Sequence, residues 1–455
     1  MWMYRILQGF LRIVTSVFFR NIAVIGSEHV PKEGAVIFAG NHPNSLMDPM
    51  LVIAYGGRIV HFAAKDILFR SRFLRFFLRG LGAVPIQRRK DHKGDIDNSA
   101  AFSALFQVLE EGRAMGIFPE GISHTAAQLS SLKTGAARIS MQWFEQHEGT
   151  LPLRIVPVGL NYLHRQRFRS QVLIQFGEPL EITKEWLEKY QEAPKETVVE
   201  LTEKLDQDLR SVTVNAPDWE VLRVLHTARR LYKPSGVYLD LPIYAELTRR
   251  LAEGYMRAED EPEIQALRQE LEAYQGRLDA LGLEDHHLRS DMSTFEVLGR
   301  LLWRFGSLLI LLPLAIPGII LHAPVMMTAV VAGDYLTARK DVVATTKLIS
   351  SILMVPLLYV LLLFLLIQVT PWSTVLTVAV LLPLSGFATV RLLEQQVALF
   401  RSLRGVWRWL YLGNELQELR EWRERISAAL DVAVDRFHDR SVPRLFEKDA
   451  TEQEG

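Results

Sequence analysis

The stretch AVIFAGNHPNSLMDP, residues 35–49, decides the fold of the N-terminal half and carries its most reactive side chains. Its first six residues are apolar or small, as in a strand that is buried on both faces of a sheet. His42 and Asp48 follow directly after this run. Polar side chains beyond the carboxyl end of such a strand lie where open α/β sheets bind their ligands. We therefore expect a functional site in this turn.

Later stretches repeat the pattern of a buried strand followed by a helix. This alternation predicts an α/β fold in which a mostly parallel sheet is flanked by helices. We place this domain at residues 21–180. The further strands are expected at GAVPIQ (82–87), AMGIFPE (114–120) and RIVPVGL (154–160), and helices near 99–112 and 134–148.

His42 and Asp48 are suited to general base catalysis. Histidine titrates near neutral pH and is the common base for a hydroxyl nucleophile. A carboxylate holds the neutral ring in one tautomer and stabilises the imidazolium that forms. Ser45 and Asp48 also fit the Ser-x-x-acid pattern that opens a helix, which would turn Asp48 back toward His42. The alternative is that Asp48 only offsets the dipole at the start of that helix.

Cations and a tight turn follow the next two strands. Arg88 and Arg89 come directly after the strand at 82–87, and arginine side chains suit a phosphate. Glu120 and Gly121 end the strand at 114–120, in a turn where the backbone can approach a ligand. These residues extend the predicted site beyond the His42 turn.

Four short blocks of this sequence, in this order along the chain, resemble the glycerolipid acyltransferases. That family shares an NH-x-S-x-x-D block, a glycine segment ending in arginine, an FPEG-x-S block and a VPV-type strand. Lys133 lies in a segment, SLKTGAARIS (131–140), that is similar to the family's Lys-x-Gly-Ala segment. The resemblance covers roughly residues 20–180, about a third of the chain. The matching blocks are residues 41–48, 82–88, 118–123 and 156–159.

Two departures from the family pattern stand out. Five residues separate His42 from Asp48, where the family usually has four, and the extra residue falls at Pro43 or Asn44. Ile122-Ser123 occupies a place where many members have Thr-Arg, which leaves more of the phosphate binding to the remaining cations. The sequence NHPNS is similar to a fungal-type branch that acylates glycerol 3-phosphate or dihydroxyacetone phosphate, and that also carries apolar helices C-terminal to its catalytic domain.

The resemblance implies an O-acyltransferase that moves a fatty acyl group to glycerol 3-phosphate or 1-acylglycerol 3-phosphate. Alternatives are dihydroxyacetone phosphate or another lysophospholipid as acceptor, and a non-catalytic membrane scaffold. The donor implied is acyl-CoA or acyl-carrier protein, and neither a metal nor a redox cofactor is implied. His42 and Asp48 would be catalytic. The residues implied in substrate binding are Arg88, Arg89, Phe118, Glu120, Gly121 and Lys133.

Composition narrows the classes of protein further. Among 455 residues, Lys plus Arg and Asp plus Glu are equal at 52 each, so no net charge points to nucleic acid. The chain contains no cysteine, which excludes disulfides, thiolate metal sites and cysteine nucleophiles. The lipid bilayer is the expected macroscopic partner, for the reasons that follow.

Two arginine-containing amphipathic segments could lie on a membrane surface. Residues 1–20 form a predicted helix, which either packs on its own domain or lies in the interface with Trp2, Phe10, Phe18 and Phe19 toward lipid. Residues 66–82 alternate arginine with phenylalanine, as in a core-packed helix with a basic face or in a helix on anionic lipid.

The C-terminal half changes character twice. Residues 181–300 are rich in Glu, Leu, Arg and Gln and predict an α-helical region with a structural role. Residues 301–395 are intensely apolar, and the run after Lys347 exceeds the ~20 residues of a bilayer span. Residues 396–455 return to charged helix.

The basic residues predict how the apolar region crosses the membrane. If 307–333 crosses once, Arg339 and Lys340 fall outside, against the positive-inside rule. If 307–333 instead turns back near Pro317-Gly318 or Pro324 as a re-entrant hairpin, every basic cluster is cytoplasmic. We expect this second arrangement, with spans at 346–369 and 374–393. Both termini and the catalytic domain are then cytoplasmic, on a bacterial inner membrane or an internal membrane.

Overall fold

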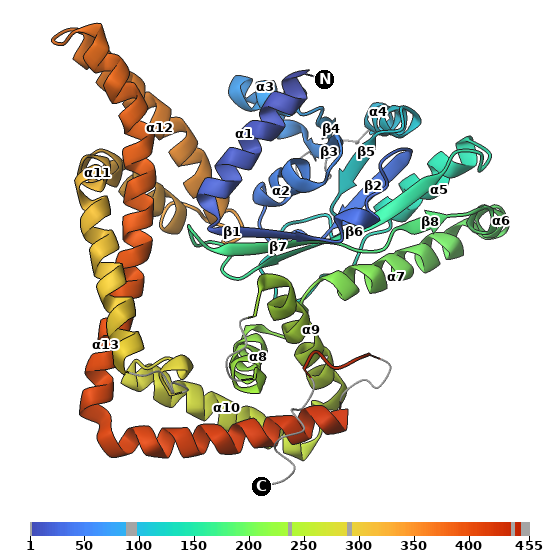
Figure 1. Ribbon diagram of the computed structural model, residues 1–455. Coiled ribbons are helices and arrows are strands. Elements are labelled where there is room, and N and C mark those ends of the chain that lie inside the picture. Colours follow the sequence, from blue (N-terminus) through green and yellow to red (C-terminus); the bar gives the residue numbers. More distant parts are fainter. Residues whose placement is uncertain (1, 88–97, 235–238, 289–293, 438–441, 447–455) are drawn as a thin grey trace. The chain divides into compact units, whose positions relative to one another are not determined.

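The computed structural model describes residues 2–87, 98–234, 239–288, 294–437 and 442–446 (Figure 1). The chain divides into two compact units. The first unit comprises Met1–Trp219, Leu239–Ala252 and Arg339–Thr345, and the second comprises Glu220–Tyr238, Glu253–Ala338 and Thr346–Gly455. The short segment Arg339–Thr345 therefore belongs to the first unit although its neighbours in sequence belong to the second.

A sheet of eight strands organises the first unit, in the order β1-β7-β6-β2-β5-β3-β4 with β8 also paired to β6. Parallel pairing links β1 to β7, and β6, β2, β5, β3 and β4 in turn. Only the β6–β7 and β6–β8 pairs are antiparallel among the described strands. The sheet is thus mostly parallel, as the alternating sequence pattern predicts. The strands are β1 (Asn21–Ile25), β2 (Ala35–Gly40), β3 (Val60–Lys65), β4 (Val84–Ile86), β5 (Ala114–Ile117), β6 (Leu153–Tyr162), β7 (Gln171–Phe176) and β8 (Leu180–Ile182).

The register of the central strands brings three loops together. Gly40 pairs with Val158 of β6, and Ala39 pairs with Ile117 of β5, all in parallel. The carboxyl ends of β2, β5 and β6 therefore meet at one edge of the sheet. This edge holds the turn after residue 40, the turn after residue 117 and the end of β6.

Helices cover both faces of the sheet (Figure 1). α1 packs on α2 and α2 contacts β3, whereas α4 and α5 contact β2 and α7 contacts β6. Alternation along β2 explains this layering, because Ile37 and Phe38 point to opposite faces and both are buried. The helices of this unit are α1 (Trp2–Phe18), α2 (Met47–Tyr55), α3 (Arg72–Gly80), α4 (Ser99–Glu110), α5 (Gly135–Gln146), α6 (Lys184–Glu192) and α7 (Pro194–Val212), with short 3-10 turns at Ser27–His29 and Asp66–Arg70.

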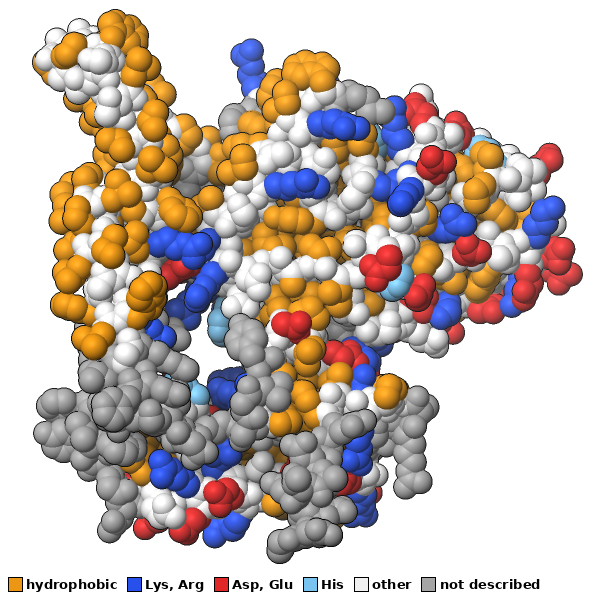
Figure 2. Space-filling view, viewed as in Figure 1, with side chains coloured by type: hydrophobic (Ala, Val, Ile, Leu, Met, Phe, Trp, Pro, Cys, Tyr) orange, Lys and Arg blue, Asp and Glu red, His pale blue; other side chains and the backbone are white. Residues whose placement is uncertain are grey.

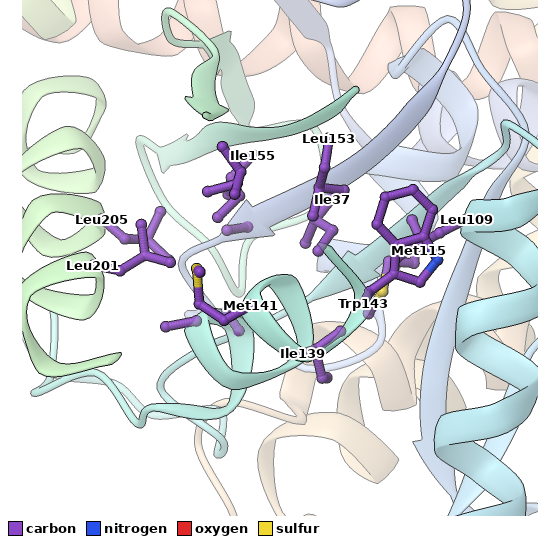
Figure 3. Close-up of a cluster of buried hydrophobic side chains, with 14 of the residues drawn as sticks. Ile37, Leu109, Met115, Ile139, Met141, Trp143, Leu153, Ile155, Leu201 and Leu205 are labelled. Atoms are coloured by element: carbon purple, nitrogen blue, oxygen red, sulfur yellow. The ribbon is translucent and has the colours of Figure 1, made fainter. Parts of the chain in front are cut away.

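The main hydrophobic core lies between the sheet and the helices α4, α5 and α7 (Figure 3). Ile37 of β2 and Ile155 of β6 meet Met141 of α5 there, and Leu201 and Leu205 of α7 close one side. Because α7 supplies core residues, the first unit continues to Trp219 and the boundary expected at residue 180 is too early.

Helix α1 uses both of its apolar faces. Tyr4, Leu7 and Leu11 are among the residues buried against the domain, while Trp2 and Ile13 are exposed. Phe18 and Phe19, expected on the lipid side, are instead buried, because the chain enters the domain core just before β1. The exposed apolar face of α1 is therefore narrower than the sequence suggests.

The second unit is helical in its described residues, as the composition of 181–300 predicts. The C-terminal half of α13 packs on α10, where Arg423 pairs with Asp285 at 3.0 Å and Trp422 donates to Glu270 at 3.1 Å. The helices that follow α7 are α8 (Trp219–Tyr232), α9 (Leu241–Ala258), α10 (Pro262–Leu281), α11 (Thr294–Asp334), α12 (Val343–Ile367) and α13 (Trp372–Phe437), with a 3-10 turn at Asp285–His287.

Within the described residues, three helices are long and apolar enough to cross a membrane: Leu302–Asp334, Val343–Ile367 and Trp372–Val397. The last two correspond to the spans expected at 346–369 and 374–393. Large apolar side chains stand exposed along α12 and the first part of α13, and hydrophobic atoms cover this arm in Figure 2. Such a surface is stable in lipid rather than in water.

Helix α11 differs from the expected hairpin, because Thr294–Asp334 is one continuous helix with three prolines inside. Its packing partner nevertheless changes along its length. Before the last proline, the Thr389 hydroxyl of α13 donates to the Ala315 carbonyl at 3.2 Å. Further on, α11 faces α12, where Lys347 pairs with Asp334 at 2.6 Å. Prolines inside a helix remove a backbone hydrogen bond and commonly kink it, but the helix α11 continues through all three.

Candidate active site

The turn after β2 is fixed to β6 by Asn41. The Asn41 side chain accepts from the Leu160 amide at 2.7 Å and donates to the Leu160 carbonyl at 3.2 Å. This double contact continues the β2–β6 pairing by one residue beyond the strand. The next residue, His42, is thereby held at the edge where β2, β5 and β6 end.

His42 and Asp48 form a hydrogen-bonded pair, as the sequence predicts. His42 Nδ1 lies 2.8 Å from Asp48 Oδ2. The Asp48 side chain is fully buried, and that of His42 is 19% exposed. With Nδ1–H donated to the carboxylate, the neutral ring carries its lone pair on Nε2. That nitrogen is the one available to accept a proton from a hydroxyl group.

Asp48 has two further partners. The Asn44 amide donates to Oδ2 at 2.7 Å, and the Tyr162 hydroxyl donates to Oδ1 at 2.6 Å. Burial raises the pKa of Asp48 above its ordinary value, and the hydrogen bonds from His42, Tyr162 and Asn44 act against that rise. Burial and the nearby Asp48 also raise the pKa of Tyr162, which therefore keeps its proton to donate.

The sequence alone did not identify Tyr162 as a residue of the site. It lies at the end of β6, four residues beyond Val158, which pairs with Gly40. The signal exists only once β6 is placed beside β2, because nothing in the stretch 154–162 itself resembles a catalytic motif. Strand order, rather than any motif, brings its hydroxyl to Asp48.

Ser45 does not open the helix as expected. α2 begins at Met47, with Leu46 at the N-cap and no side-chain capping bond. Ser45 adopts a left-handed φ of 49°, which is uncommon for a residue other than glycine. The chain therefore changes direction at Ser45, within the longer turn. Asp48, in the first turn of α2, then contacts His42.

Glu120 braces the backbone of His42. Its Oε1 accepts from the His42 amide at 2.7 Å and its Oε2 accepts from the Ser130 amide at 2.9 Å, with His124 Nε2 also in contact with Oε2. The His124 amide in turn donates to the His42 carbonyl at 3.2 Å. Buried Glu120 thus holds the His42 backbone and the segment at Ser130 together, and its expected part in substrate binding stays a prediction.

Lys133 lies beside the turn that contains Gly121, and its amide donates to the Pro119 carbonyl at 2.8 Å. Gly121 has a φ of 74°, and a Cβ there would come within 2.8 Å of Lys133 Nζ. Glycine is therefore required both for the backbone conformation and for the close approach of the lysine. Lys133 is the cation that this structure places beside the FPEG turn among the substrate-binding residues expected from the sequence.

Phe118 stacks flat on the His42 ring. The two ring centroids are 4.1 Å apart with an interplanar angle of 5°, and Phe62 stacks on the other side of Phe118 at 5.3 Å. Phe118 therefore restrains the plane of the His42 ring, a contact that the sequence did not suggest. Arg88 and Arg89, the remaining two expected residues, lie outside the described part of the chain.

Arg165 is a second site residue that the sequence did not single out. Its guanidinium donates to the Thr125 carbonyl at 2.9 Å and lies 4.6 Å from the centre of the Trp219 ring. Burial lowers the pKa of Arg165, against the attraction of Asp48 and Asp341. It ties the loop after Glu120 to the segment that follows β6.

A mostly parallel α/β domain with a carboxylate-oriented histidine at the end of a central strand has the geometry to activate a hydroxyl group. Comparison with known proteins specifies the class. Residues 21–161 match the family model "Acyltransferase", and residues 224–441 match the "Glycerol-3-phosphate acyltransferase 2 C-terminal domain". Together these two matches cover most of the chain, and the protein is an acyltransferase that carries both domains.

Curated relatives extend over most of the chain. Glycerol-3-phosphate O-acyltransferase 2 of Saccharomyces cerevisiae is 26% identical over 94% of this chain and 76% of its own length. Glycerol-3-phosphate O-acyltransferase 1 of the same yeast is 35% identical over 58% of this chain and 37% of its own length. Among solved structures, the 1-acyl-sn-glycerophosphate acyltransferase PlsC of Thermotoga maritima aligns with 44% of this chain and 79% of its own chain, at 22% identity and a TM-score of 0.31.

Proposed function

We propose that this protein is a membrane-bound glycerol-3-phosphate acyltransferase, with His42 as its general base. The observation that carries the proposal is the hydrogen bond between His42 and buried Asp48, in a chain whose C-terminal half matches the glycerol-3-phosphate acyltransferase 2 domain. The acceptor is taken from the yeast relative that aligns with 94% of the chain. The product is lysophosphatidic acid.

The reaction follows from the tautomer of His42. Nε2 removes the proton of an acceptor hydroxyl, and the oxygen attacks the carbonyl carbon of an acyl thioester. A carbon–oxygen bond forms, the carbon–sulfur bond breaks, and the proton passes from His42 to the leaving thiolate. Asp48 stabilises the imidazolium while the ring holds the proton. No covalent acyl-enzyme is needed.

The acceptor phosphate needs cations near the same sheet edge. Lys133 supports this assignment by its place beside Gly121, and Arg88 and Arg89 are assigned to it from their position after β4 in the sequence. Charge-assisted hydrogen bonds of this kind contribute ~1.5–3 kcal/mol each. Phosphorylated acceptors are therefore preferred over free glycerol.

The test is acyl transfer by the purified protein in lipid vesicles. Radiolabelled glycerol 3-phosphate, 1-acylglycerol 3-phosphate and dihydroxyacetone phosphate are each supplied with acyl-CoA or with acyl-carrier protein. Glycerol 3-phosphate is expected to give the highest kcat/KM, and His42→Ala is expected to lower it ~10²–10⁴-fold. His286→Ala, at an exposed histidine of the second unit, serves as the control.

Two results would contradict the proposal. A folded His42→Ala variant that keeps more than a tenth of the activity removes His42 from the role of base. A higher kcat/KM with 1-acylglycerol 3-phosphate or dihydroxyacetone phosphate reassigns the acceptor while leaving the chemistry intact.

The division of the chain also supports a membrane topology. Between Trp219 and Leu302 the described residues contain no helix that is long and apolar enough to cross a membrane. Residue 302 therefore starts on the same side as the first unit. Arg339–Thr345 is part of the first unit, which favours a topology in which α11 returns to that side, α12 crosses the membrane and α13 crosses back. The positive-inside rule favours the cytoplasm for this side.

Single cysteines in this cysteine-free chain test the topology. A membrane-impermeant thiol reagent applied to intact cells is expected to label Ser373→Cys, in the α12–α13 connection. It is expected to leave Lys340→Cys and Glu418→Cys unlabelled until the membrane is opened. Labelling of Lys340→Cys in sealed cells contradicts the return of α11.

A further inference from the structure

The loop between α11 and α12 is part of the first unit. Its segment Arg339–Thr345 clusters with the sheet domain rather than with the helices on either side. The Gln166 side chain, which follows β6, donates to the Lys340 carbonyl at 2.6 Å. A segment that lies far from the catalytic motifs in sequence is thus held at the edge of the sheet where those motifs meet.

Arg339 and Asp341 both form hydrogen bonds with Ser123 in the FPEGIS turn. The Arg339 guanidinium donates to the Ser123 carbonyl at 3.1 Å and to its hydroxyl at 3.0 Å. It also pairs with both oxygens of Asp341, at 3.1 and 2.6 Å. The Ser123 hydroxyl donates to Asp341 Oδ2. Three side chains therefore form one closed set of contacts around the turn.

Burial distinguishes this cluster from an ordinary surface ion pair. The Asp341 side chain is 6% exposed, although that of Arg339 is 51% exposed. Burial acts to raise the pKa of Asp341, but the hydrogen bonds from Ser123 and Arg339 outweigh it and the pKa is lowered. The carboxylate is thus an ionised anchor that needs both partners, whereas exposed pairs contribute little.

Ser123 is one residue from the groups that hold the base. The neighbouring His124 amide donates to the His42 carbonyl at 3.2 Å. The His124 side chain contacts Glu120 and lies 2.9 Å from the Ser130 hydroxyl, and Glu120 holds the His42 amide. Through these contacts, a displacement of Ser123 would reach both the amide and the carbonyl of His42.

We infer that Arg339 and Asp341 are positioning residues for acyl transfer, so that a loop between two membrane helices completes the catalytic turn. This inference rests on the proposed function for its kinetic readout. The arginine that reaches the FPEGIS turn comes from the α11–α12 loop. The Arg339 guanidinium donates to Ser123 and to Asp341, and these contacts hold the turn in place.

The kinetic experiment uses the full-length protein in vesicles. Arg339→Ala and Asp341→Asn are expected to lower kcat at least ~10-fold, because small displacements of a catalytic group are costly. The KM for glycerol 3-phosphate is expected to change less than about threefold, since the contacts reach the base rather than the substrate. Arg339→Lys retains the charge without the fork and is expected to recover activity only in part.

Lys340→Ala is the matched control. It removes one positive charge from the same loop, at an exposed side chain, and leaves the carbonyl that Gln166 binds. Its kcat is expected to equal that of the wild type. The inference is overturned if folded Arg339→Ala keeps kcat within threefold, if Lys340→Ala loses as much, or if only the KM for the acceptor rises.

Hydrogen exchange separates this inference from the proposed function. The amides of residues 118–126, which include the His124 amide on the His42 carbonyl, are expected to exchange faster in Arg339→Ala than in the wild type or Lys340→Ala. Unchanged protection contradicts the inference. This measurement needs no substrate, so a wild type that is inactive with every acceptor refutes the proposed acceptor while exchange still decides the role of the loop.

Discussion

The sheet domain and the apolar helices place the same kinds of side chain in opposite places. In the domain, Ile37 and its neighbours on β2 are buried, whereas along α12 large apolar side chains such as Leu361 are exposed. The helices instead bury polar groups: His322 Nε2 meets the Tyr359 hydroxyl at 2.7 Å, and Ser385 and Thr389 are buried. The difference shows which solvent each region is built for, water around the first and lipid around the second.

Each region also contains a histidine joined to a tyrosine, but the chemistry differs. In the domain, His42 and Tyr162 share a buried carboxylate, so the cluster carries a charge and can accept a proton. In the helices, the hydrogen bonds of His322 among the described residues are to the Gly318 carbonyl and the Tyr359 hydroxyl, and neither partner is a carboxylate. We expect the first cluster to govern catalysis and the second to govern only helix packing.

Removing the charge of the domain cluster is expected to have the largest effect. Asp48→Asn keeps the shape but lets the amide hold the wrong tautomer of His42, and kcat is expected to fall ~10³–10⁴-fold. Steady-state acyl transfer with glycerol 3-phosphate measures this, and thermal unfolding confirms that the variant is folded. Activity within tenfold of the wild type would show that the carboxylate does not orient the base.

Matched truncations test the opposite burial of the two regions. Ile37→Ala leaves a cavity in the domain core and is expected to cost ~2–5 kcal/mol of unfolding free energy. Leu361→Ala, at a side chain that is 53% exposed on α12, is expected to change stability by less than ~0.5 kcal/mol. Thermal unfolding in one lipid preparation compares them, and equal losses would mean that α12 packs against protein rather than lipid.

Removing the Tyr162 hydroxyl is expected to have a smaller effect that depends on pH. Tyr162→Phe loses a hydrogen bond to a charged group, worth ~1.5–3 kcal/mol, so kcat/KM is expected to fall ~10–100-fold. The pKa of Asp48, already raised by burial, rises further when this bond is lost. Because catalysis needs the ionised carboxylate, activity is then lost at a higher pH as the solution is acidified. An acid limb that stays in place would assign Tyr162 a packing role only.

The helix cluster is expected to show the smallest effect. Tyr359→Phe removes the hydrogen bond to His322, and such bonds between membrane helices average ~0.6 kcal/mol. Unfolding of the variant in vesicles is expected to shift slightly, with kcat unchanged. A large loss of kcat in Tyr359→Phe would show that the His322–Tyr359 cluster contributes to catalysis and not only to helix packing.

The sequence predicted the elements that depend on local pattern. β2 is found at the residues expected, because six consecutive apolar or small residues specify a strand buried on both faces. The contact of His42 with Asp48 also agrees with the expectation, although Ser45 does not cap the helix. The domain boundary expected at residue 180 could not be read as well from the sequence. Leu201 of α7 belongs to the core of the sheet domain because it packs beside β6, and local sequence does not show that contact.

The unpredicted parts of the site depend on contacts between distant segments. Tyr162 reaches Asp48 only because β6 lies beside β2, and Arg339 reaches Ser123 across 216 residues of chain. No periodicity or spacing carries such information. The tight turn at Gly121 was readable, since a glycine there is demanded by local backbone conformation.

The stack of Phe118 on His42 has an electrostatic consequence for the reaction. The face of an aromatic ring is negative, so it attracts a cation that lies over it within ~6 Å of its centre. In the proposed reaction His42 becomes such a cation when it takes the acceptor's proton, and the ring centroids are 4.1 Å apart. We therefore expect the face of Phe118 to attract the imidazolium of that proposed step. An apolar side chain would in this way add an electrostatic contact to the proton transfer without carrying a charge itself.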